Sequence, residues 1–189
     1  MSNILDNQSN FNPRDVSVMP TGNKWGLILG GVGIALTLLF QLTGMMDYSG
    51  TKSNIIPNIV NWSAMGLIFY MGIKEHKEQD LEGYLSLGQG MKMGLYISLI
   101  SGILTAVFTF ILFKFIQPDM MSNIMETAIE NAEEKGQDAD NIRKGMEMMS
   151  WRFTPAMMSI FALIGSIIFG AIISLIASLI LKKDRSLFK

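Results

Sequence analysis

Long uncharged blocks alternate with polar segments along the chain. Four blocks contain no charged residue, namely residues 26–46, 55–73, 94–113 and 156–181. At 1.5 Å of rise per residue, each block would form a helix about 28–39 Å long, and the hydrocarbon core of a bilayer is about 30 Å thick. The pattern therefore predicts an all-α integral membrane protein, built as a bundle of four transmembrane helices.

Polar residues define the edges of this predicted domain. Residues 1–24 are rich in Asn and Ser and are predicted to be a disordered polar tail, which leaves a single four-span domain over residues 25–185. Ser86 and Gln89 have the spacing of a capping box, in which each side chain bonds the backbone N–H of the other residue. The third helix is therefore expected to begin near Leu87, inside the aqueous interface.

The largest polar segment, residues 117–154, separates the third span from the fourth. Apolar residues recur at helical spacing over 124–132, and Gly136 interrupts the pattern. A second apolar face then follows at i, i+4, i+7 and i+11, formed by Ile142, Met146, Met149 and Phe153. We predict an extramembrane amphipathic helical hairpin that offers this second face to a partner. The pattern leaves open whether the hairpin lies on the bilayer or on the bundle.

Small residues recur at every fourth position within the spans. They are Gly94, Ser98, Gly102 and Ala106 in the third span, Ala162, Ser166, Gly170, Ser174 and Ser178 in the fourth, and Gly26 and Gly30 in the first. Lipid tails are as apolar as leucine, so helices associate in membranes through close van der Waals contact, which small residues permit. We interpret these stripes as packing seams within the bundle, with a contact between two copies of the chain as the alternative.

Three amides are the main polar side chains inside the spans, and they are Gln41, Asn58 and Asn61. Polar groups in hydrocarbon are costly unless they are bonded, so each is a candidate for function. The loop between the first two spans is short, which places Gln41 and Asn61 at similar depth. An interhelical hydrogen bond is the favoured interpretation, and a ligand or ion site is the alternative.

Composition excludes several classes of chemistry. The net charge is −1, so the chain has no basic field to hold nucleic acid. Cysteine is absent and His76 is the single histidine, which removes thiolate chemistry and most zinc sites. His76 and the neighbouring carboxylates (Glu75, Glu78, Asp80 and Glu82) are expected to form a solvated face. The 16 methionines are interpreted as packing or partner contacts rather than copper ligands, so we expect no cofactor and no metal.

Lysine and arginine counts predict the orientation of the spans. Nine of these residues fall on the side of the two termini and the second loop, against six on the other side. Most of the six lie in residues 117–154 among eight acids. Both termini are therefore predicted to be cytoplasmic and the hairpin to be external.

A family resemblance covers nearly the whole chain beyond the tail. The segments GIKEHKEQ and YLSLGQGMKMGL, the later QPDMM and the final SLIASLILKKD are similar to the family called domain of unknown function 4199. The resemblance implies a small four-span protein of the bacterial inner membrane, mainly from Bacteroidota. That family has no established activity, so the resemblance implies no functional residue.

The favoured function is that of a non-enzymatic scaffold or accessory subunit that acts through protein contacts in the membrane. The alternative is a transporter or channel for a small solute or ion, oligomeric and using the three intramembrane amides. The expected partners are the lipid bilayer and either another membrane protein or further copies of this chain.

Overall fold

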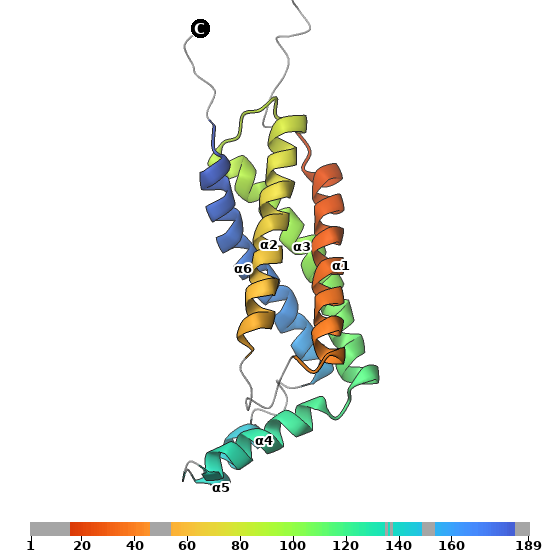
Figure 1. Cartoon of the computed structure of the whole chain (residues 1–189), viewed down its shortest axis with the longest axis vertical. Helices are drawn as coiled ribbons and strands as arrows, with labels where there is room; N and C mark the ends of the chain where they lie inside the picture. The colour runs from red at the N-terminus through yellow and green to blue at the C-terminus, as the bar shows by residue number, and fades with distance from the viewer. Residues whose placement is uncertain (1–15, 46–53, 135, 137, 149–153, 184–189) are drawn as a thin grey trace, which may run out of the picture.

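Four long helices form the bundle, arranged as Figure 1 shows. The computed structural model describes residues 16–45, 54–134, 136, 138–148 and 154–183. The long helices are α1 (Met19–Leu42), α2 (Ile55–Glu75), α3 (Leu87–Ile111) and α6 (Pro155–Leu181), and short π-helical segments extend α2 as η2 (His76–Asp80) and α3 as η3 (Leu112–Ile116). Within the described residues, four helices are long and apolar enough to cross a membrane. This confirms the predicted all-α membrane bundle.

The two remaining helices, α4 (Met120–Glu134) and α5 (Ala139–Met148), form a hairpin at one end of the bundle. Gly136 lies between them with φ +70°, a left-handed conformation that favours glycine. We call this end of the bundle the hairpin end. At the opposite end, called here the terminal end, α1 begins and α6 finishes, as Figure 1 shows.

Two helix boundaries differ from those predicted. The first helix begins at Met19, so residues 19–24 are helical and not part of the polar tail; its first turn contains Pro20, which needs no backbone N–H bond there. The third helix continues past Lys114 through η3 as far as Ile116. Its start lies at Leu87, where Ser86 and Gln89 form a capping box.

Helices α3 and α6 meet along their small residues. Facing pairs along this seam are Gly90 with Ser178, Gly94 with Ser174, Ser98 with Gly170, and Gly102 with Ser166. A Cβ placed on Gly94 would overlap the hydroxyl and the Cβ of Ser174 and would lie 3.3 Å from its Cα, so no side chain fits at this position. At Gly102 the nearest atoms would be 3.0 Å from such a Cβ, all of them side-chain atoms. The seam is therefore widest toward the hairpin end, where the half-buried Ala106 and Ala162 are next in register.

Most seam hydroxyls bond to backbone carbonyls and so remain compatible with lipid. Ser98 Oγ donates to the Gly94 carbonyl at 2.8 Å, and Ser174 Oγ donates to that of Gly170. Ser166 Oγ crosses the seam and donates to the Ser98 carbonyl at 3.2 Å. Ser178 Oγ is buried without a partner among the described residues. These serines supply small volume at little polar cost.

Helix α1 packs on the other side of α3, also through glycines. A Cβ on Gly26 would lie 2.6 Å from the Ile100 Cβ, and one on Gly30 would lie 2.7 Å from Leu104 Cδ2. The buried hydrophobic core lies mainly in the half of the bundle nearer the terminal end. Its fully buried members include Phe69, Ile73, Leu85, Met93 and Ile97.

Candidate functional site

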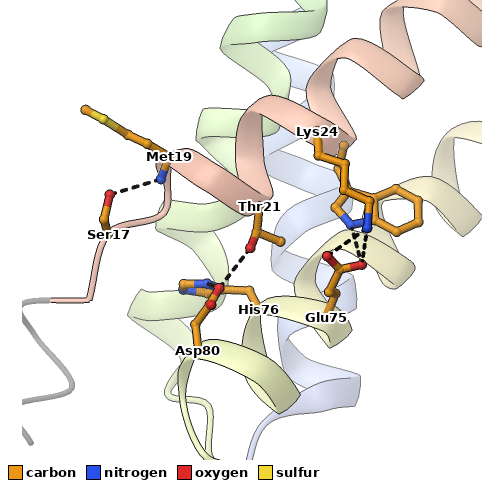
Figure 2. Close-up of polar contacts among 8 residues, drawn as sticks. Ser17, Met19, Thr21, Lys24, Glu75, His76 and Asp80 are labelled. Atoms are coloured by element: carbon orange, nitrogen blue, oxygen red, sulfur yellow. Dashed lines mark hydrogen bonds and ion pairs between the residues drawn. The ribbon is translucent and has the colours of Figure 1, made fainter.

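A polar cluster joins α1 to α2 at the terminal end (Figure 2). Lys24 Nζ donates to both carboxylate oxygens of Glu75, at 2.9 and 2.8 Å. The indole Nε1–H of Trp25 donates to the same carboxylate at 3.1 Å. Glu75 therefore accepts from two neighbouring residues of α1 and links α2 to that helix.

The second half of the cluster is centred on Asp80. His76 Nδ1 lies 2.7 Å from Asp80 Oδ2, and the Thr21 hydroxyl donates to the same oxygen at 2.9 Å. The π-helical turn η2 brings Asp80 beside His76. His76 is buried, with 1 % of its surface exposed. The cluster ties the end of α2 to the first turn of α1.

The order of these contacts determines what chemistry the cluster can perform. In a catalytic triad the histidine lies between the hydroxyl and the carboxylate, so that it can take the hydroxyl proton. Here Asp80 lies between Thr21 and His76, and the Thr21 hydroxyl bonds the carboxylate. Thr21 is therefore not activated by His76 through these contacts. The arrangement is suited to holding helices together.

The structure corrects the expected solvation of this region. His76 is buried rather than solvated, and Glu75 and Asp80 are half-buried rather than part of a solvated face; Glu78 is exposed, with its side chain 3.9 Å from Lys74. A periodic signal was available, because Phe69, Ile73, His76 and Asp80 follow one another at i, i+4, i+7 and i+11. The charged composition of the segment obscured that periodicity.

A cavity of about 450 Å³, open to the surface of the bundle, lies between the four spans. All four contribute to its lining, with Leu29, Gly33, Ser101, Thr105 and Gly165 among the residues of α1, α3 and α6. From α2 come Asn58, Asn61, Trp62 and Ile68. The cavity thus contains two of the three predicted intramembrane amides. It lies where the α3–α6 seam widens, next to Ser166.

Gln41 has a different partner from the one expected. Its side-chain amide donates to Gln117, which follows η3 at the end of the third span. Gln41 thus bonds to the end of the third span and not to Asn61, because the extra turn of helix past Lys114 carries Gln117 to the end of α1. Within the described residues, the side chains of Asn58 and Asn61 make no hydrogen bond.

The predicted partner surface on the second arm of the hairpin is only partly described. Ile142 lies on α5 and is half-buried. The side chain of Met146, and all of Met149 and Phe153, lie outside the described residues. On α4, Glu126, Glu130, Glu133 and Glu134 are all exposed, while Ala132 is 5 % exposed. The first arm therefore has an acidic outer face.

In the described parts of the chain, no group of three His, Asp or Glu side chains lies where it could hold a metal ion.

Comparison with protein families identifies the chain. A family model described as "Protein of unknown function (DUF4199)" matches residues 24–183. The chain belongs to this family. The match to the DUF4199 model begins at Lys24 and ends at Lys183, so it includes the hairpin, the spans beyond the first residues of α1, and the polar cluster except for Thr21. No curated protein and no solved structure matches the chain.

Proposed function

We propose that this membrane protein is a non-enzymatic accessory subunit or scaffold that binds a protein partner through its α4–α5 hairpin. The observation that supports this proposal is the hairpin itself, which lies at one end of the spans (Figure 1). The exposed glutamates of α4 give it an acidic outer face. Its first arm carries Glu126, Glu130 and Glu134 at four-residue spacing, a single stripe along α4. Such a stripe favours a partner with a basic surface.

Charge also argues against the bilayer as the binding surface of the hairpin. Residues 117–154 contain eight Asp and Glu against four Lys and Arg. Anionic lipids attract basic helices and repel acidic ones, so the electrostatic term disfavours contact with the membrane. We therefore propose that the hairpin contacts protein. By the positive-inside rule, we place it on the external face of a bacterial inner membrane, with both termini cytoplasmic.

Charge reversal on the hairpin tests this function. The full chain, with an affinity tag, is crosslinked in native membranes and purified as wild type and as the double variant Glu126→Lys/Glu130→Lys. We expect a stoichiometric protein partner with wild type and at least tenfold less with the variant. A charge reversal at Glu78, which is exposed at the terminal end, serves as the matched control and should leave recovery unchanged.

Equal recovery with all three proteins would contradict the proposed role of the hairpin. Recovery lost equally with Glu78→Lys would show a general charge effect and contradict it as well.

A transport role is the second candidate, and the cavity between the spans favours it. Asn58 and Asn61 line this cavity, and amides of this kind can bind a polar solute. The purified chain reconstituted in liposomes would then be an oligomer that catalyses flux, and replacing both residues with leucine would abolish it. A monomer without flux would count against transport.

A further inference from the structure

We propose that the cavity between the four spans binds one acyl chain of a membrane phospholipid, taken from the leaflet on the hairpin side. This binding site is separate from the protein contacts proposed for the hairpin. Its volume of about 450 Å³ falls in the range of ligand pockets, which is about 300–1,000 Å³.

The length and depth of the cavity match one leaflet. Along α2 its lining runs from Asn58 to Ile68, which is about 15 Å of helix. The hydrocarbon core of a bilayer is about 30 Å thick, so each leaflet contributes about 15 Å. Because α2 begins at Ile55 near the hairpin end, Asn58 lies at the shallow end of the cavity and Ile68 near the middle of the membrane.

The polarity of the lining changes along the same direction. The shallow end contains the amides of Asn58 and Asn61, and the deep end contains Leu29 and Ile68. The hydroxyls of the two serines in the lining already donate to the carbonyl of Ser98, at 3.2 Å from Ser101 and 3.2 Å from Ser166. Their donors are therefore not offered to a ligand. This gradient fits a molecule with a polar head and an apolar chain.

The two amides suit the ester linkage of a phospholipid. An asparagine side chain has an NH₂ group with two donors, and an ester carbonyl only accepts. Within the described residues neither Asn58 nor Asn61 uses its side chain in a hydrogen bond. Both lie about one or two helical turns inside the start of α2, and in this proposal that is where the ester groups of the outer-lying lipid meet the hydrocarbon.

Open space inside the cavity is shown by two glycines of its lining. A Cβ placed on Gly33 or Gly165 would meet no atom within 4 Å. Beside this space, Trp62 of α2 and Phe169 of α6 meet edge-on with ring centroids 5.3 Å apart. Both rings are about half exposed, at 50 % and 48 %, so they border the cavity on its lipid side. An acyl chain can therefore fill the space from the surrounding bilayer.

The experiment compares the lipid bound by the wild type with the lipid bound by variants in which a side chain fills the cavity. The full chain is placed in nanodiscs of phosphatidylethanolamine and phosphatidylglycerol that contain phosphatidylcholine spin-labelled near the end of one acyl chain. Electron paramagnetic resonance then reports the immobilised fraction. We expect Gly165→Leu and Gly33→Leu each to lose about one immobilised lipid per chain. Gly31→Leu is the matched control, since Gly31 also faces open space but lies outside the cavity lining, and it should equal wild type.

Two further measurements identify the ligand. The double variant Asn58→Leu/Asn61→Leu should bind the labelled phospholipid about two- to tenfold more weakly, the ratio expected for a lost neutral hydrogen bond. Spin-labelled stearic acid should show no cavity-dependent immobilisation. An equal signal in wild type and both cavity variants would overturn the proposal, as would an equal loss in Gly31→Leu. Cavity-dependent binding of stearic acid in preference to phospholipid would overturn the assignment to phospholipid.

Discussion

The two ends of the bundle are built in opposite ways. At the terminal end, Glu75 and Asp80 tie α2 to α1, and the seam between α3 and α6 is too tight for a Cβ at Gly94. At the hairpin end the same seam widens at Gly102, and a cavity separates the spans. Both ends use small residues in apolar helices. A small residue that faces another helix at short distance closes the bundle, and one that faces open space leaves a cavity.

This difference places the closely packed half of the bundle and the proposed binding surfaces at opposite ends. Most of the buried core, including Phe69, Ile73 and Leu85, lies in the terminal half, so that half resists opening. The proposed lipid and protein contacts both lie toward the hairpin end. Proteins commonly place binding surfaces on elements with fewer buried contacts, because such elements can adjust to a partner.

The largest effect is expected from a side chain placed in the tight part of the seam. Gly94→Leu should lower the free energy of unfolding by more than about 3 kcal/mol, because the added atoms overlap the Ser174 side chain, whose Cβ is held by the α6 backbone. Thermal unfolding of the purified protein in detergent measures the effect. Gly31→Leu, which faces open space, is the control. An unchanged unfolding temperature for Gly94→Leu would show that the seam is not the main packing contact.

A smaller loss is expected from the polar cluster. His76→Ala removes a buried ring and its bond to Asp80, and it should cost about 2–3 kcal/mol of unfolding free energy. Gln79→Ala, at an exposed position in the same turn, is the matched control and should change little. Chemical denaturation in mixed micelles provides the comparison. Equal values for the two variants would mean that the cluster does not hold the terminal end together.

The smallest effect is expected inside the cavity. Gly165→Leu should leave stability in detergent unchanged or raise it by up to about 1 kcal/mol, because leucine is a better helix former than glycine and the space is open. The same thermal assay applies. A loss comparable to that of Gly94→Leu would show that the hairpin end is as closely packed as the terminal end, and the contrast between the two ends would fail.

Sequence reasoning predicted the features that depend on local pattern. The four spans follow from long uncharged blocks, and the capping box at Ser86 and Gln89 follows from spacing, since its atoms are three residues apart. The sequence predicted the two stripes that contain Gly94 and Ser174, but it did not predict that these two residues face each other. Their register depends on how the helices dock, which no single helix determines.

The sequence pattern predicted none of the polar contacts between residues that are far apart along the chain. Thr21 and Lys24 read as part of a polar tail, yet their partners Asp80 and Glu75 lie 59 and 51 residues away along the chain. The bond from Gln41 to Gln117 depends on the extension of the third helix to Ile116, which the sequence pattern does not predict. The cavity around Asn58 is a property of packing between four helices, and composition alone does not reveal it.

The pairing of Leu85 with Lys183 has a consequence for the order of assembly. The two residues exchange backbone hydrogen bonds of 3.0 Å each. These bonds connect the loop before α3 to the segment that follows α6. Lys183 is the last described residue to leave the ribosome. We therefore expect these bonds to form only after α6 has entered the membrane beside α3. A chain shortened to Leu181 should insert all four spans but lack the backbone bonds that join the start of α3 to the end of α6.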